Sequence, residues 1–290
     1  MLTRRQVLHT GAVVAAASLV PSLAARPAKV RLKKAVKFAM IKAPSIMEQF
    51  ELAKKCGFVG VEADSPSPLN KEEMVRARDK TGVVIHGVID SVHWNKRLSD
   101  PSEKVREEGR LAFEGALRDA KFFGADTCLL VPGRVANKQT ENFEQCWERS
   151  TAEVRKVIPL AEELGVKIAI EVVWNDFLTT PELLIKYVDQ FKSPWVGAYF
   201  DASNMIKYGV PSAEWIRRLG KRMLKMDFKG YHYDKKAWVG IGEGTENWPE
   251  ILKACEEVGY NTWATAEVSG GGEDKLLDIS KRMDRILELN

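Results

Sequence analysis

The amino-acid sequence predicts an α/β protein that consists of one closed barrel of alternating strands and helices. Eight short apolar segments follow residue 36, and segments of helical periodicity separate them. Strands that are apolar almost throughout are typical of a parallel sheet covered by helices. Several helical segments end in glycine directly before the next strand, as at Gly57, Gly124 and Gly165, and glycine is the usual residue after a helix end. These observations together predict a single-domain (β/α)8 TIM barrel.

The expected strands can be placed in chain order from the apolar segments. They cover residues 36–41, 58–62, 83–89, 126–131, 166–173, 196–201, 222–228 and 262–267. The longest helical patterns between them span residues 104–123 and 141–164. An open doubly wound sheet is disfavoured because the segment after the first strand, residues 41–44, lacks the glycines of a dinucleotide-binding turn.

Composition limits the classes of partner. The 290 residues are 45% hydrophobic and 29% charged, which is ordinary for a globular protein. The formal net charge is +4, and no basic block is longer than a few residues, so we expect no nucleic-acid partner. The short basic stretch at 29–34 is interpreted as part of a solvated linker that covers residues 25–35, and the barrel is expected over residues 36–290.

The N-terminus has the pattern of an export signal. Arg4 and Arg5 precede an apolar run at 11–20, and small residues allow cleavage after Ala24. The paired arginines resemble a twin-arginine signal, so residues 1–24 predict an exported, periplasmic protein. An uncleaved membrane anchor is the alternative, although the apolar run is shorter than a standard span. We therefore expect no stable membrane span after cleavage.

Four carboxylates stand where apolar strands end in the second half of the chain. Glu171, Asp201, Asp227 and Glu267 occupy the ends of four consecutive expected strands. A buried carboxylate is costly unless a counter-charge pairs with it, and neighbouring strands of a barrel bring such groups together. The sequence therefore predicts one divalent metal site, and all-oxygen ligands favour Mn²⁺ or Mg²⁺. Separate salt bridges to helices or loops are the alternative.

The chain resembles a known family at six places. The stretches are GFVGVE (57–62), IEVVWN (170–175), FDASN (200–204), KMDFKG (225–230), GIGEGTENW (240–248) and TAEVSGG (265–271). They resemble the sugar phosphate isomerase/epimerase superfamily, whose fold is the xylose-isomerase-like TIM barrel. The resemblance implies that the four carboxylates bind one metal ion and that Glu171 and Glu267 are the catalytic acid/base pair.

Two positions depart from the family pattern. Asp227 stands where the family usually has histidine, and Asn204 ends an Asp-x-x-Asn motif where the family has Asp-x-x-His. The first change favours a hard metal ion, and the second removes an imidazole that commonly binds substrate. Both leave the substrate open.

Other side chains near the expected strand ends are candidates for binding a sugar. They are Glu62, His86, His93, Trp94, Trp174, Asn204, Lys225 and Lys229. A period of two places both lysines on the same strand face as Asp227. Some candidates have a plainer alternative: Glu62 could pair with Lys42, His86 could be a core group, and the tryptophans could seal the barrel mouth.

The resemblance implies a metal-dependent sugar or keto-sugar isomerase or epimerase that works by proton abstraction and an enediolate intermediate. The export signal favours an unphosphorylated substrate. The alternatives are a lyase that cleaves 3-keto-glycosides by β-elimination and a non-catalytic sugar-binding protein. A related endonuclease would need a histidine-rich zinc site, and the chain has four histidines. The sequence leaves open whether the protein forms a homo-oligomer.

Overall fold

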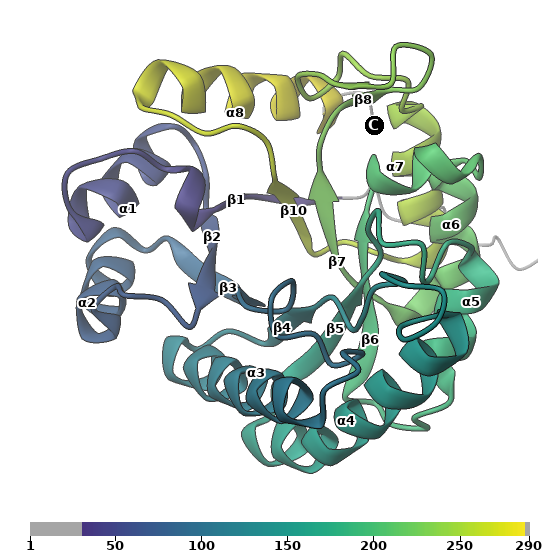
Figure 1. The fold of residues 1–290 in the computed structure, drawn as a ribbon. Helices are drawn as coiled ribbons and strands as arrows, with labels where there is room; N and C mark the ends of the chain where they lie inside the picture. Colours follow the sequence, from purple (N-terminus) through teal and green to yellow (C-terminus); the bar gives the residue numbers. More distant parts are fainter. Residues whose placement is uncertain (1–30, 288–290) are drawn as a thin grey trace, which may run out of the picture.

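The computed structural model describes residues 31–287, and within them the chain forms a closed barrel of parallel strands (Figure 1). The order around the barrel is β1-β10-β7-β6-β5-β4-β3-β2. The barrel strands are β1 (Lys33–Lys37), β2 (Gly60–Ser65), β3 (Val84–Asp90), β4 (Thr127–Leu130), β5 (Lys167–Glu171), β6 (Val196–Asp201), β7 (Met223–Phe228) and β10 (Trp263–Ala266). The predicted single-domain (β/α)8 barrel is confirmed, whereas the predicted export signal lies outside the described residues.

Helices surround the barrel and cover the outer face of its strands (Figure 1). They are α1 (Ile46–Lys55), α2 (Lys71–Thr81), α3 (Glu103–Phe123), α4 (Phe143–Leu164), α5 (Pro181–Asp189), α6 (Ser212–Leu219), α7 (Trp248–Val258) and α8 (Glu273–Leu287). The main hydrophobic core lies between this layer and the strands. No helix in residues 31–287 is both long enough and apolar enough to cross a bilayer.

Local sequence signals explain where helices begin and end. Asn142 begins α4 with a capping box, in which its side chain and that of Gln145 each accept a hydrogen bond from the other residue's backbone N–H. Gly165 ends the same helix with φ of 69°, a left-handed conformation that glycine adopts without a steric penalty. Short loops of this kind return the chain directly to the next strand.

The first strand lies earlier in the chain than expected. The prediction placed it at residues 36–41, but β1 covers Lys33–Lys37 and a 3-10 turn follows at Phe38–Met40. Ladder pairing with β10 and β2 ends within residues 33–37, whereas the apolar run continues into the turn. The side chain at the carboxyl end of the strand is therefore Lys37, and Lys42 is not in that position.

A small antiparallel hairpin follows β7. Its strands are β8 (Tyr231–His232) and β9 (Ala237–Trp238), and it lies on the carboxyl-end side of the barrel. Figure 1 shows β8 above the end of β7 and close to the end of α8. This hairpin provides Trp238 to the cavity described below.

Candidate active site

Four carboxylates converge at the carboxyl end of the barrel. Glu171, Asp201 and Asp227 lie on β5, β6 and β7, and Glu267 follows β10 directly. One oxygen from each residue lies within 4.8 Å of the oxygens from the other three. The register of β6 and β7 explains part of this arrangement, because Asp201 and Asp227 are directly paired. The structure thus brings together all four residues of the predicted metal site.

Two lysines neutralise part of the charge of this cluster. Lys229 Nζ lies 3.0 Å from Asp201 Oδ2 and 2.5 Å from Glu267 Oε2. Lys37 Nζ lies 3.0 Å from Asp227 Oδ2 and 2.5 Å from Glu62 Oε2. Each ammonium group therefore bridges two carboxylates at a place where little water can screen the charges.

A tyrosine inside the barrel completes the network around Lys37. The hydroxyl of Tyr199 donates a hydrogen bond to Asp227 Oδ1 at 2.7 Å and lies 3.0 Å from Glu62 Oε2. Lys37 Nζ also lies 3.3 Å from the tyrosine oxygen. Tyr199, Glu62 and Asp227 are each fully buried, so this network fixes the orientation of Asp227 from below.

The two glutamates of the predicted acid/base pair have opposite pKa shifts in the metal-free protein. Burial raises the pKa of Glu171 to about 8, and the negative charge of Glu267 adds to this shift. Burial would also raise the pKa of Glu267, but Lys37 and Lys229 outweigh it and lower that pKa to about 2. Two neighbouring carboxyl groups with divergent pKa values are typical of catalytic acid/base pairs.

The donor set fits a hard divalent cation. Asp201 Oδ2, Asp227 Oδ2 and Glu267 Oε2 are buried and accept no hydrogen bond, although each lies within ion-pair distance of a lysine. Buried oxygens without a hydrogen bond are costly unless another ligand satisfies them. Carboxylate oxygens are preferred by Mg²⁺ and Mn²⁺, so Glu171, Asp201, Asp227 and Glu267 could hold such an ion.

A cavity of about 440 Å³ opens above the carboxylates. Of the predicted site residues, its walls include Glu171, His93, Trp94, Trp174, Asn204, Lys229 and Glu267. Trp174 stacks on Trp238 with ring centroids 4.9 Å apart, and the edge of its ring meets Tyr231. Burial lowers the pKa of His93 to about 4, which keeps this imidazole neutral. The cavity thus combines aromatic walls with a charged floor, as small-ligand sites do.

Three predicted substrate-binding residues, Glu62, His86 and Lys225, do not line this cavity. Lys225 Nζ pairs with Asp126 at 2.8 Å, and Asp126 precedes β4 at the amino end of the barrel. The same ammonium group donates to the backbone oxygen of His86, whose ring stacks on Trp263. The alternation of side chains along β7 does place Lys225 on the same strand face as Asp227. The two residues are nevertheless roughly 6.6 Å apart along the strand, so Lys225 lies at a different depth in the barrel.

The proposed pairing of Glu62 with Lys42 is wrong. Lys42 is exposed, and its ammonium group donates to the backbone oxygen of Ala39. Glu62 pairs with Lys37, which the sequence reasoning missed together with Tyr199. The position of Lys37 inside the apolar stretch of residues 35–41 was a signal that could have revealed this pairing. A lysine is rarely buried unless an acidic group pairs with it.

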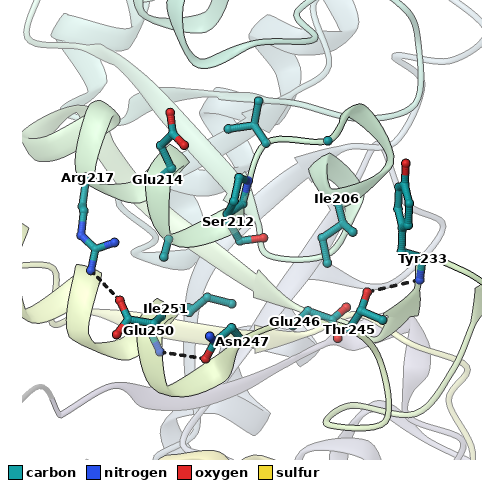
Figure 2. A pocket seen from close by; sticks show the side chains of 14 residues that line it. Ile206, Ser212, Glu214, Arg217, Tyr233, Thr245, Glu246, Asn247, Glu250 and Ile251 are labelled. Carbon is teal, nitrogen blue, oxygen red and sulfur yellow. Dashed lines mark hydrogen bonds and ion pairs between the residues drawn. The ribbon is translucent and has the colours of Figure 1, made fainter.

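A larger hollow of about 640 Å³ lies between α6 and α7, away from the carboxylates (Figure 2). Its polar groups are largely satisfied by one another. Arg217 pairs with Glu250, and Asn247 accepts a hydrogen bond from the backbone of Glu250 at the start of α7. The residues around this hollow include none of the four converging carboxylates, so the chemistry of the site belongs to the smaller cavity.

Comparison with known proteins agrees with this architecture. A putative L-ribulose-5-phosphate 3-epimerase, SgbU of Escherichia coli (strain K12), is 26% identical over 239 residues, which cover 77% of this chain and 83% of the relative. The uncharacterized protein MJ1311 of Methanocaldococcus jannaschii is 24% identical over 203 residues, or 67% of this chain and 68% of the relative.

Solved structures share the fold. A D-tagatose 3-epimerase-like protein superposes with a TM-score of 0.77 at 20% identity, covering 89% of this chain and 98% of the other. The 3-keto-D-glucoside 4-epimerase YcjR of E. coli superposes with a TM-score of 0.74 at 15% identity, covering 88% and 99%. The family model described as xylose isomerase-like TIM barrel matches residues 50–287, and the chain therefore belongs to that family.

Proposed function

We propose that this protein is a metal-dependent isomerase or epimerase of an unphosphorylated sugar or keto-sugar. The observation that carries the proposal is the convergence of Glu171, Asp201, Asp227 and Glu267 on one point at the floor of a cavity with aromatic walls. The sugar epimerases among the relatives and structural neighbours support the reaction class.

The chain's own residues account for proton transfer from two sides. Glu171 and Glu267 are separated by β6 and β7 around the barrel, so their carboxyl groups approach the cavity from different directions. One removes the proton beside the substrate carbonyl and the other returns it, as epimerisation requires. A bound Mn²⁺ or Mg²⁺ would supply Lewis-acid stabilisation of the oxygen charge that develops. Lys229 holds Glu267 at the cavity wall.

The charges of the cavity favour a substrate without phosphate. Its two lining cations, Lys37 and Lys229, each already bridge two carboxylates. A phosphate group in the cavity would face Asp64, Glu171 and Glu267 without a free cation to bind it. Export to the periplasm is part of this proposal; it rests on residues 1–24, and cell fractionation of the full-length protein tests it.

The test is isotope exchange in deuterated water. Protein loaded with Mn²⁺ or Mg²⁺ is incubated with D-tagatose, D-psicose, D-fructose or D-ribulose 5-phosphate, and deuterium next to the carbonyl is followed by NMR. We expect exchange with a free sugar and a loss of about 10²- to 10⁴-fold in Glu171→Gln and in Glu267→Gln. Glu214→Gln, which changes a glutamate of the hollow between α6 and α7, serves as the matched control. Absence of exchange with every sugar, or full exchange in both site variants, contradicts the proposal.

A further inference from the structure

A second cavity of about 440 Å³ adjoins the first. Lys229, Trp238 and Glu267 line both cavities and therefore form a shared wall. The remaining walls of the second cavity come from Gly230 after β7, the segment after β9, the segment after β10 and one face of α8. The proposed reaction uses only the first cavity and leaves the second without a role.

The second cavity is polar without a net charge. Its lining has three cationic and three acidic side chains, alongside apolar groups such as Ile241 and Ile279. Arg282 is held by Asp278 at 2.8 Å and by Glu243 at 2.6 Å. An anionic group would meet three carboxylates there, whereas a neutral polyhydroxylated ring can donate to the acids and accept from the cations.

Lys275 is the lining cation that remains available to a ligand. It is exposed on α8, and within residues 31–287 no ion pair engages it. Ser269 is also exposed and adds a hydroxyl group to the same lining. These two side chains can form new hydrogen bonds without breaking an existing contact.

Trp238 forms the junction of the two cavities. Its ring stacks on Trp174 at 4.9 Å, and Lys229 Nζ lies 5.5 Å from its centroid. Even so, 49% of this residue is exposed, which is a large apolar surface for a side chain at a binding site. A ligand that extends from one cavity into the other would cover this surface. Glu267 lies on the same wall, so the reacting carbon would be close to the bond that joins the two parts of such a ligand.

We propose that the second cavity binds a second sugar ring, so that the preferred substrate is a disaccharide or a similar glycoside and not a single monosaccharide. This inference rests on the proposed isomerase or epimerase function of the first cavity. The reacting ring lies above the four carboxylates, and the attached ring contacts Trp238, Ser269 and Lys275.

The experiment compares D-fructose with lactulose and isomaltulose, two disaccharides that contain fructose. We expect the metal-loaded protein to exchange solvent deuterium into at least one disaccharide with kcat/KM about tenfold above that for fructose. Ser269→Trp fills the second cavity from an exposed position and is expected to abolish this preference while fructose exchange stays unchanged. Lys275→Ala is expected to reduce the preference, and Lys281→Ala, on the same helix and outside the cavity, is the matched control.

The outcomes separate this inference from the proposed function. The second-ring site is overturned if fructose exchanges deuterium at least as fast as both disaccharides and Ser269→Trp has no effect. This result leaves the isomerase proposal intact. If no sugar exchanges deuterium, the proposed function fails, and calorimetric titration then decides on the site. Tighter binding of a disaccharide than of fructose, weakened by Ser269→Trp, supports the site, and equal binding overturns it.

Discussion

Replacement of Lys37 by methionine is expected to lower the free energy of unfolding of the metal-free protein by about 3–5 kcal/mol. Lys37 is 4% exposed, and its two partners, Glu62 and Asp227, are fully buried. Methionine keeps most of the side-chain volume but removes the ammonium group. Two carboxylates then lose their counter-charge in a region where burial already raises the pKa of Asp227 well above its usual range. Protonation of Asp227 relieves part of this cost, which places the expected value near 3 kcal/mol.

Urea unfolding at pH 7, followed by circular dichroism, measures this difference. Lys42→Met is the matched control, because Lys42 is exposed and donates only to a backbone oxygen. We expect the control to change stability by less than about 0.5 kcal/mol. Addition of Mn²⁺ should recover part of the loss in Lys37→Met, since a divalent ion gives Asp227 a new counter-charge.

A cost below about 1 kcal/mol for Lys37→Met would refute the reasoning, because breaking a desolvated ion pair cannot be so mild. An equal loss in Lys42→Met would refute it too, since that result would favour a pairing of Glu62 with Lys42. A double-mutant cycle with Glu62→Gln isolates the pair, and we expect a coupling energy of about 1–3 kcal/mol.

Three further outcomes follow from the same structure. Glu171 has a pKa raised to about 8 and must lose its proton to bind a metal ion, so binding of Mn²⁺ to the metal-free protein near pH 7 should release about one proton more than binding to Glu171→Gln. Calorimetry in two buffers measures this difference. Below pH 8 the affinity for Mn²⁺ should also fall about tenfold more per pH unit in the unchanged protein than in Glu171→Gln. Because the pKa of Glu171 is raised on folding, its protonated carboxyl group stabilises the folded protein. This contribution to the free energy of unfolding is complete below pH 4.5 and is lost as the pH rises through about 8. The free energy of unfolding of the metal-free protein should therefore fall more between pH 5 and pH 8 than that of Glu171→Gln. Arg97→Met should lower the free energy of unfolding by about 3 kcal/mol in the same assay, because Glu141 is 2% exposed and accepts two hydrogen bonds from Arg97. Release of the loop that contains Arg97 should also change the fluorescence of Trp94. Unchanged stability and fluorescence would show that this ion pair does not hold the loop.

The barrel could be predicted because its signals are local. Most strands are short apolar runs, and α4 is typical of the helices that begin at a capping residue and end at a glycine. The converging carboxylates could be predicted for the same reason, since Glu171, Asp201 and Glu267 each stand at the end of an apolar run. Consecutive strands of a barrel are neighbours, so their order in the chain already implied their proximity.

The end of the first strand could not be predicted in this way. The apolar run continues past Lys37, and only pairing with β2 and β10 ends the strand there. The depth of Lys225 was also hidden, because a period of two gives the face of a strand but not the height within the barrel. The junction at Trp238 depends on a hairpin whose strands have two residues each, which is too short for any periodicity to reveal.

The sequence by itself therefore determined the fold of this protein and the four carboxylates at its centre, because hydrophobic periodicity and strand order are properties of the chain. Only the tertiary structure decided how the charge of that centre is balanced. Lys37 and Lys229 each bridge two acids that lie far apart in the chain, and Tyr199 joins two of them from inside the barrel. Such contacts depend on where side chains from different strands meet in a desolvated space, and no local pattern encodes that meeting.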